Sequence, residues 1–132
     1  MGFEEISHTA DWSARIWAED LSSLFVEAAR AMNSLSGTVA GNGPRVRQSF
    51  SAEAPDAESL LVAFLSEMLY LQEQKDLTFD QFDLRVASQW LKVEMEGTQT
   101  ASSEKAIKAV TYHNLRIEKT NQGFEVTIVF DV

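Results

Sequence analysis

One long stretch of apolar residues in the middle of the chain places the strongest constraint on its fold. Its apolar side chains recur at three- and four-residue spacing, which predicts an α-helix that starts after Pro55-Asp56 and runs to about Gln74. Because the apolar positions cover a broad face of this helix, we expect most of it to be buried. The sequence therefore predicts a central core helix. Its apolar positions are Leu60, Leu61, Phe64, Leu65, Met68, Leu69 and Leu71.

A second helix and several strands are predicted on either side of this core helix. Residues 21–35 have helical apolar spacing, with Asp20 as the N-cap and Gly37 at the end. Residues 97–105 are small and polar, and we expect them to form a mobile loop. Alternating apolar residues predict strands over residues 3–6, 14–18, 45–52, 78–86, 91–95, 106–119 and 124–130.

Consecutive strands around two helices are typical of one class of fold. We expect an α+β fold, in which an antiparallel or mixed β-sheet sandwich is packed with two main α-helices. The chain has 132 residues, 45% of them apolar, which is enough for one hydrophobic core and too few for two comfortable domains. The sequence therefore predicts a single domain over residues 1–132.

Composition excludes several classes of protein. The chain has no cysteine, which rules out a disulfide framework, a thiolate metal site and a cysteine nucleophile. We find no apolar run of the roughly 20 residues that span a bilayer, and the N-terminus lacks the basic and apolar regions of a signal peptide. The expectation is a soluble protein of the cytoplasm with no membrane association.

The charge of the chain bears on its partners. The net charge is −9 and the isoelectric point is near 4.6. Tight binding to nucleic acid depends largely on cations that neutralise phosphates, so we expect no direct, tight binding to RNA or DNA. An acidic surface suits a divalent cation or a basic protein partner, and it also keeps a small domain in solution.

Carboxylates near the two ends of the sequence are the first candidate site. Asp11 follows the polar run Ser7-His8-Thr9-Ala10, and taken alone it is typical of a turn or cap. Asp131 alternates away from the apolar side of the last strand, and only Val132 with its α-carboxylate follows in the sequence. Neighbouring anions repel each other unless a cation or hydrogen-bond donors compensate. If Asp11 lies at the same place, oxygen ligands alone favour a hard cation such as Mg²⁺ or Ca²⁺.

Other polar residues give weaker indications. His8 and His113 have no metal-ligand spacing, so zinc is not expected, and a lone histidine is more often structural. Lys108 shares strand parity with Val110 and Tyr112 and is expected to extend to water. The chain has no phosphate-binding loop, dinucleotide fingerprint or serine nucleophile elbow. These features do not indicate an enzyme that acts alone.

Three segments, taken in order, resemble one known family. They are His8-Thr9-Ala10-Asp11 near the start, Ile107-Lys108-Ala109-Val110-Thr111-Tyr112-His113 late in the chain, and Val129-Phe130-Asp131-Val132 at its end. Together with the two predicted helices they resemble the archease family over essentially the whole chain. Archeases are small accessory proteins of the GTP-dependent RNA-splicing ligase of the RtcB kind. They promote guanylylation of the active-site histidine of the ligase and sustain its multiple turnover.

The resemblance implies roles for individual residues. Asp11, Asp131 and Val132 would form a site for a divalent cation, which could be Ca²⁺, Mg²⁺ or Mn²⁺. Lys108 would be offered to the active site of the partner ligase, so this chain would assist catalysis without being an enzyme. His8, Tyr112 and His113 would support the site. A cation and a lysine both stabilise negative charge during phosphoryl transfer.

Two positions depart from the usual archease pattern, and alternative functions stay open. The family commonly has an acidic residue where this chain has Ser7, and a glutamate where it has Ala106. One alternative function is a small metal-dependent phosphohydrolase. Another is a general chaperone or adaptor for nucleic-acid-modifying enzymes, acting without a metal. The sequence does not determine which cation is bound, whether the protein self-associates, or which RNAs are joined.

Overall fold

The computed structural model describes residues 1–6 and 12–132. These residues form two helices and two antiparallel sheets. In chain order the elements are β1 (Gly2–Ile6), β2 (Trp12–Ala18), α1 (Leu21–Ser36), β3 (Val39–Ala40), β4 (Val46–Glu53), α2 (Ala57–Lys75), β5 (Leu77–Val86), β6 (Trp90–Ser102), β7 (Ala109–Val110), β8 (Glu118–Thr120) and β9 (Gly123–Asp131). The structure thus confirms the predicted α+β class, with both sheets antiparallel.

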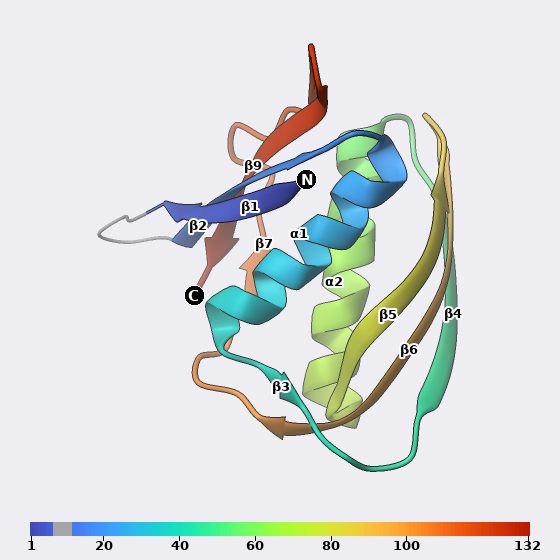
Figure 1. The fold of residues 1–132 in the computed structure, drawn as a ribbon, viewed down its shortest axis with the longest axis vertical. Helices are drawn as coiled ribbons and strands as arrows, with labels where there is room; N and C mark the ends of the chain where they lie inside the picture. Colours follow the sequence, from blue (N-terminus) through green and yellow to red (C-terminus); the bar gives the residue numbers. More distant parts are fainter. Residues whose placement is uncertain (7–11) are drawn as a thin grey trace.

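The two helices lie between the two sheets. One sheet has the order β1-β2-β9-β7, with β8 also paired to β9, and in the other β6 pairs with β3, β4 and β5. Helix α1 packs on β1 and β2 from the first sheet and on β5 from the second, and α2 packs on β7 and on β4, β5 and β6. Figure 1 shows this arrangement, with the helices in the centre of the molecule. Each helix therefore buries apolar residues on more than one side.

Local capping chemistry fixes the ends of both helices. The Asp20 carboxylate accepts a hydrogen bond from the Ser23 backbone N–H at 2.7 Å, which satisfies one of the free donors of the first turn of α1. Gly37 ends α1 in the left-handed conformation, at φ 64°. The Asp56 carboxylate caps α2 in the same way, since it accepts a hydrogen bond from the Ser59 backbone N–H at 2.7 Å. The predicted starts of both helices and the predicted end of α1 are confirmed.

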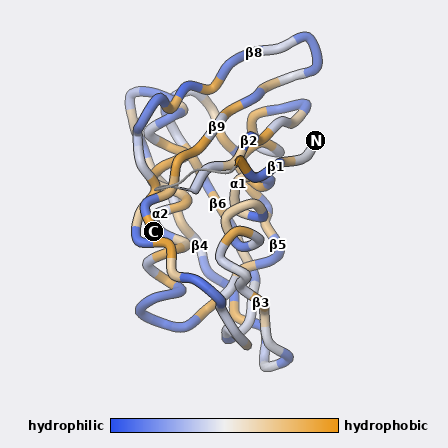
Figure 2. Tube along the Cα trace, turned by 90° about the vertical axis from the view of Figure 1, so that its left-hand side faces the viewer, coloured by the Kyte–Doolittle hydropathy of each residue, from blue (hydrophilic) through white to orange (hydrophobic). Residues whose placement is uncertain are grey.

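The core joins the two helices to both sheets. Phe64 of α2 is fully buried and lies between Phe25 of α1, at a ring distance of 6.3 Å, and Phe82 of β5, at 5.9 Å. Ile16 of β2 and Phe130 of β9 are also fully buried. Hydrophobic residues recur along the helices and the inner strands, whereas hydrophilic residues dominate the outer turns (Figure 2). The apolar positions predicted for α2 supply much of this core.

The prediction of a mobile loop over residues 97–105 was wrong for residues 97–102. Strand β6 continues to Ser102, because β3 and β5 pair with this part of it. Thr98 is buried and donates a hydrogen bond from its hydroxyl to the Gly41 carbonyl at 3.0 Å, and the Thr78 and Thr100 hydroxyls lie 2.6 Å apart. Here the small polar residues form part of a paired strand rather than a loop.

The prediction of one strand over residues 106–119 was also wrong. In this part of the chain two short strands pair with β9, Ala109–Val110 (β7) and Glu118–Thr120 (β8), and the segment between them is irregular. Asn114 has a left-handed backbone at φ 51°, which a continuous strand does not tolerate. Ile107 and Val110 are buried while Lys108 is exposed, so the burial pattern does not alternate as in a strand.

The final strand follows its prediction closely. In β9, Val126, Ile128 and Phe130 are buried, whereas Asp131 is exposed. Strand β9 lies between β2 and β7, and it therefore holds the centre of the first sheet. Among the described residues, no helix is long and apolar enough to cross a membrane.

Candidate functional site

The end of β9 brings together segments that lie far apart in the sequence. On one side, Phe130 is paired with Trp12, the first residue of β2 and the residue that follows Asp11 in the sequence. On the other side, Asp131 is paired with Ala109 of β7. The Lys108 backbone N–H donates a hydrogen bond to the Asp131 carbonyl oxygen at 2.7 Å. The pairing of β7 with β9 thus places Lys108 beside Asp131.

Residues 103–108, here called the bridging segment, connect β6 to β7. The Glu104 and Lys105 backbone N–H groups both donate to the Ser36 carbonyl oxygen at 3.0 Å, in the last turn of α1. The carbonyl groups at a helix C-terminus have no partner within the helix, so these donors satisfy one of them. Ile107 is buried in the core. The bridging segment, which follows β6 in Figure 1, therefore runs from the end of α1 to the end of β9.

A short turn follows β7 and presents polar and aromatic side chains to solvent. The Thr111 N–H donates to the Val129 carbonyl at 3.0 Å, which continues the pairing with β9. The His113 N–H then donates to the Thr111 hydroxyl at 3.3 Å, and Leu115 closes the turn on the Tyr112 carbonyl at 3.1 Å. Tyr112 is 59% exposed. The turn is therefore rigid at its base and open at its tip.

Helix α2 anchors the far end of the same segment. The Glu58 carboxylate, in the first turn of α2, accepts a hydrogen bond from the Ile117 N–H at 3.0 Å. Leu115 and Ile117 pack against the core, half-buried. The segment that carries Tyr112 and His113 is thus held at one end by β9 and at the other by α2.

The predicted site residues divide into two groups. Lys108 and Asp131 are adjacent through a backbone hydrogen bond, Val132 follows Asp131, and Tyr112 and His113 lie on the turn just after β7. His8 and Asp11 lie outside the described residues. Within residues 1–6 and 12–132, no three His, Asp or Glu side chains are grouped so as to hold a metal ion. The predicted cation site, which includes Asp11, stays a prediction.

The chemistry of the described donors suits a hard cation. Asp131 is exposed at the end of β9 and offers carboxylate oxygens, the ligand type that Mg²⁺ and Ca²⁺ prefer. The backbone N–H of Lys108 donates to the Asp131 carbonyl and so leaves the side-chain carboxylate to other ligands. Lys108 is exposed just before β7 and carries a positive charge. The described contact between Lys108 and Asp131 is made by their backbones.

Sequence reasoning missed one contact at this site. The Lys105 ammonium nitrogen lies over the Trp12 indole ring, 4.3 Å from its centre, which is a cation–π geometry. The two residues come from opposite ends of the sequence, and no spacing rule connects them. Only the placement of the bridging segment on α1 brings Lys105 to the start of β2.

The titratable groups with a shifted pKa in the described part of the chain lie elsewhere. Hydrogen bonds to Glu4 and then to Glu125 raise the pKa of Arg15, which also stacks on Trp17 at 4.5 Å, on the first sheet. Hydrogen bonds to Asp80 and Glu96 raise the pKa of Arg45 on the second sheet. These surface ion pairs are structural and contribute little to stability.

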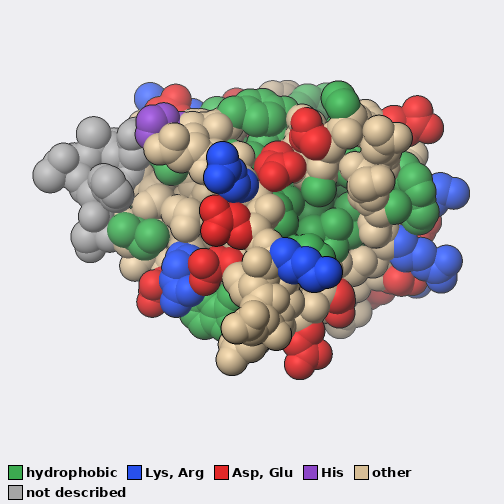
Figure 3. Space-filling view, turned by 90° about the horizontal axis from the view of Figure 1, so that it is seen from above, with side chains coloured by type: hydrophobic (Ala, Val, Ile, Leu, Met, Phe, Trp, Pro, Cys, Tyr) green, Lys and Arg blue, Asp and Glu red, His purple; other side chains and the backbone are tan. Residues whose placement is uncertain are grey.

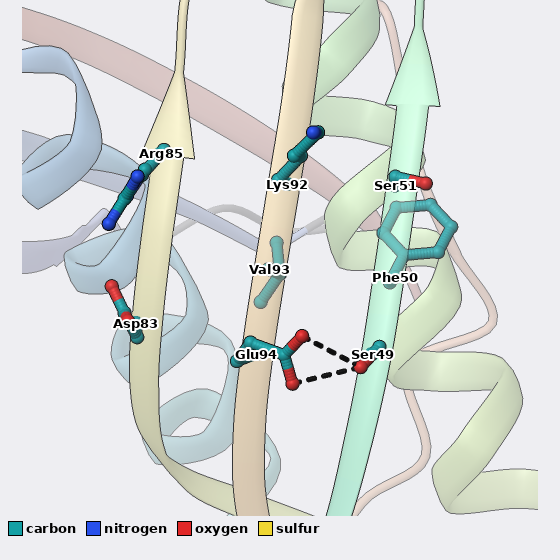
Figure 4. Close-up of a pocket in the computed structure, with 8 residues that line it drawn as sticks. All are labelled: Ser49, Phe50, Ser51, Asp83, Arg85, Lys92, Val93 and Glu94. Carbon is teal, nitrogen blue, oxygen red and sulfur yellow. Dashed lines mark hydrogen bonds between the residues drawn. The ribbon is translucent and has the colours of Figure 1, made fainter.

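A hollow on the second sheet lies away from the predicted site. It has a volume of about 370 Å³ and is lined by polar side chains of β4, β5 and β6 together with Phe50 and Val93. Figure 4 shows Asp83 and Arg85 on β5, Lys92 and Glu94 on β6, and the Ser49 hydroxyl within hydrogen-bond distance of both carboxylate oxygens of Glu94. Like charges lie opposite each other across the two strands, because Asp83 is paired with Glu94 and Arg85 with Lys92. Along each strand, an acidic side chain and a basic side chain lie two residues apart. Of the predicted site residues that the structure describes, none lines this hollow.

Charges of both signs are mixed on the end of the molecule seen in Figure 3. There, lysine and arginine side chains stand singly among aspartate and glutamate side chains, with hydrophobic side chains between them. The described part of this face shows no continuous basic patch of the kind that binds phosphate backbones. The expectation of no direct, tight binding to nucleic acid stays a prediction.

Comparisons with known proteins agree on one family. Residues 3–132 match the model of the Archease protein family (MTH1598/TM1083). The chain is 35% identical over 145 residues to protein archease of Methanosarcina mazei and 34% identical over 141 residues to that of Methanosarcina barkeri. Each of these alignments covers 98% of this chain and 95% of the relative.

Two solved structures share the fold. The crystal structure of an archease, described as a possible chaperone, from Thermotoga maritima has a TM-score of 0.74 at 21% identity and covers 98% of this chain and 96% of its own. The solution structure of protein 1598 from Methanobacterium thermoautotrophicum has a TM-score of 0.72 at 22% identity and covers 99% of both chains. The match over residues 3–132, together with relatives above 30% identity, establishes the family. The chain belongs to the archease family.

Proposed function

We propose that this protein activates a GTP-dependent RNA-splicing ligase of the RtcB kind. It promotes guanylylation of the active-site histidine of the ligase and so sustains multiple turnover. The main support is the pairing of β7 with the end of β9, which holds Lys108 beside Asp131 in a chain of the archease family. Two of the residues that the resemblance singles out are thus neighbours, although 22 residues lie between them in the sequence.

In this proposal Asp131 holds a divalent cation together with Asp11 and Val132. Asp11 is covalently joined to Trp12, which is paired with Phe130, the residue before Asp131. The cation, when bound, neutralises phosphate oxygens of the nucleotide. Lys108 supplies a second positive charge to the same oxygens, because charge stabilisation and positioning are the main protein contributions to phosphoryl transfer.

The exposure of these groups favours action on a partner rather than on a small molecule. Lys108 and Asp131 are exposed, and Tyr112 is 59% exposed on the neighbouring turn. Small-molecule sites are usually concave and bury most of the ligand. An open site of this kind is instead suited to insertion against the nucleotide site of another protein, so we propose that the protein has no ligase activity of its own.

The test measures guanylylation of the cognate ligase with labelled GTP at limiting Mn²⁺. Wild-type protein is expected to raise both the rate of guanylylation and the number of turnovers. Lys108→Met, Asp131→Asn and Asp11→Asn are expected to abolish the stimulation. Lys92→Met, a lysine on the exposed face of β6, is the matched control and should stimulate as well as wild type.

Folding is checked separately, because a misfolded variant would also fail to stimulate. Each variant should keep the wild-type circular dichroism spectrum and melting temperature, since Lys108 and Asp131 are exposed. Failure of the wild-type protein to stimulate its ligase, or full stimulation by the Lys108 and Asp131 variants, would contradict the proposal.

The two alternative functions predict different outcomes in the same assays. A small metal-dependent phosphohydrolase would release phosphate from phosphate esters without any ligase. A general chaperone that needs no metal would act equally well with Lys108 or Asp131 replaced; the Thermotoga maritima relative is described as a possible chaperone. Loss of stimulation in Lys108→Met and Asp131→Asn, with no phosphate release by the protein alone, separates the proposed function from both.

A further inference from the structure

Trp12 and Lys105 form a contact at the edge of the proposed site. Trp12 begins β2, is half-buried against the core and is paired with Phe130. The Lys105 ammonium nitrogen lies 4.3 Å from the centre of its indole ring. A cation over the face of a tryptophan is attracted by the negative charge of the ring face, and tryptophan is the strongest such partner. The contact joins the start of β2 to the bridging segment.

The bridging segment is fixed at its other points by contacts that do not involve the side chain of Lys105. Its backbone donates twice to the Ser36 carbonyl, and the Ser103 hydroxyl lies 3.1 Å from the Thr38 hydroxyl. The Thr38 hydroxyl in turn accepts a hydrogen bond from the Gln72 amide of α2 at 3.0 Å. The first half of the segment is therefore tied to both helices.

The second half of the segment has fewer ties. Between Lys105 and the Lys108 N–H, which donates to the Asp131 carbonyl at 2.7 Å, the segment crosses an exposed Ala106 and a buried Ile107. The Lys105 side chain, where the two halves of the segment meet, contacts Trp12 at the start of β2. This contact joins the start of β2 to the approach to β7, on either side of the end of β9.

We propose that Lys105 is a positioning residue that acts through Trp12. Its ammonium group holds the bridging segment against the start of β2, which keeps the Lys108 backbone hydrogen-bonded to Asp131. The functional part of this inference rests on the proposed function, because it is Lys108 that would be offered to the ligase. The positional part concerns the folded chain alone and needs neither the cation nor the ligase.

The positional part is tested by amide hydrogen exchange of the protein alone, in a chelator so that no cation contributes. An exposed cation–π contact is weak, so Lys105→Met should speed exchange of the Lys108 amide about two- to fivefold. Lys105→Arg keeps a cation that stacks on tryptophan and should restore the wild-type rate. Lys92→Met removes an exposed lysine of β6 and should leave the rate unchanged.

A double-mutant cycle shows whether Lys105 acts through Trp12. Trp12→Leu removes the ring and keeps an apolar side chain at the start of β2. In that background, Lys105→Met should change the Lys108 exchange rate by much less than it does in wild type. An unchanged rate in Lys105→Met, a Lys105→Arg rate as fast as that of Lys105→Met, or an undiminished effect in the Trp12→Leu background would each overturn the inference.

The functional part is tested in the guanylylation assay. Lys105→Met should reduce stimulation of the ligase, and Lys105→Arg should restore it, a rescue that loss of folding would not give. Equal stimulation by wild type and Lys105→Met overturns the functional part. No stimulation by the wild-type protein instead contradicts the proposed function, and the exchange data then still decide the positional part.

Discussion

Gly37 ends helix α1 and lies directly against the bridging segment. Its backbone is left-handed, at φ 64°, and a Cβ atom placed there would lie 2.7 Å from a carboxylate oxygen of Glu104 and 2.8 Å from its Cγ and Cδ atoms. Real Cβ atoms essentially never approach other heavy atoms this closely. The substitution Gly37→Ala therefore tests both the helix end and the seat of the bridging segment.

Two costs add in this variant. A left-handed backbone costs a residue with a Cβ about 1–2 kcal/mol. The Glu104 side chain must also move, which is easier because it is flexible and on the surface. The free energy of unfolding should therefore fall by about 1–2 kcal/mol or slightly more. For a chain of this size that corresponds to a melting temperature lower by about 4–8 °C.

Urea unfolding and calorimetry measure the effect, and two variants serve as controls. A Cβ atom at Gly43 would have no neighbour within 4 Å, and the backbone there has no positive φ, so Gly43→Ala should be neutral or slightly stabilising. Glu104→Ala removes the contacting atoms, so Gly37→Ala in that background should retain only the backbone cost. Equal stabilities for Gly37→Ala and Gly43→Ala would refute the reasoning.

Three further substitutions test the core, a cap and a close strand contact. Phe64→Ala removes the ring between Phe25 and Phe82 and should lower the free energy of unfolding by about 3–5 kcal/mol in urea titrations, whereas Phe64→Leu should cost less. The backbone hydrogen bond from Ser59 lowers the pKa of Asp56 below its ordinary value of 3.8. The ionised Asp56 cap therefore stabilises the fold fully above pH 3.8, and this stabilisation is lost as the pH falls through the lower pKa of the folded state. The stability difference between wild type and Asp56→Ala should thus narrow between about pH 6 and about pH 3. Gly97→Ala would place a Cβ 2.0 Å from the Thr78 carbonyl oxygen, a backbone contact that cannot yield easily, and should cost about 3 kcal/mol or prevent folding, as read by circular dichroism.

The helices and the last strand were predictable because their determinants are local. The apolar spacing of α2, its start after Asp56 and the Asp20 cap of α1 depend on a few neighbouring residues, and the structure has each of them as predicted. The alternation in β9 likewise sets which side of the strand faces the core, and Asp131 is on the exposed side as predicted. Periodicity and capping are written in consecutive residues, so a single sequence reveals them.

The extension of β6 and the brevity of β7 were not predictable in this way. Thr98 is buried because Gly41 and β5 lie against it, and those neighbours are distant in the sequence. Ala109–Val110 pairs with β9 for two residues only, after which Asn114 adopts a left-handed backbone. Small polar residues and β-branched residues both occur in loops and strands, so tertiary pairing decides between them.

For the candidate site, the sequence by itself determined the chemistry: an acidic chain without cysteine, a lysine in a family motif, and an aspartate on the exposed side of the last strand. Only the tertiary structure decided which groups are neighbours. Antiparallel pairing of β2 and β7 on either side of β9 places Trp12 opposite Phe130 and Lys108 beside Asp131. The same pairing, with the bridging segment bound at the end of α1, brings Lys105 over Trp12. The physical reason is that side-chain chemistry belongs to each residue, whereas proximity depends on hydrogen bonds and packing between strands far apart in the chain.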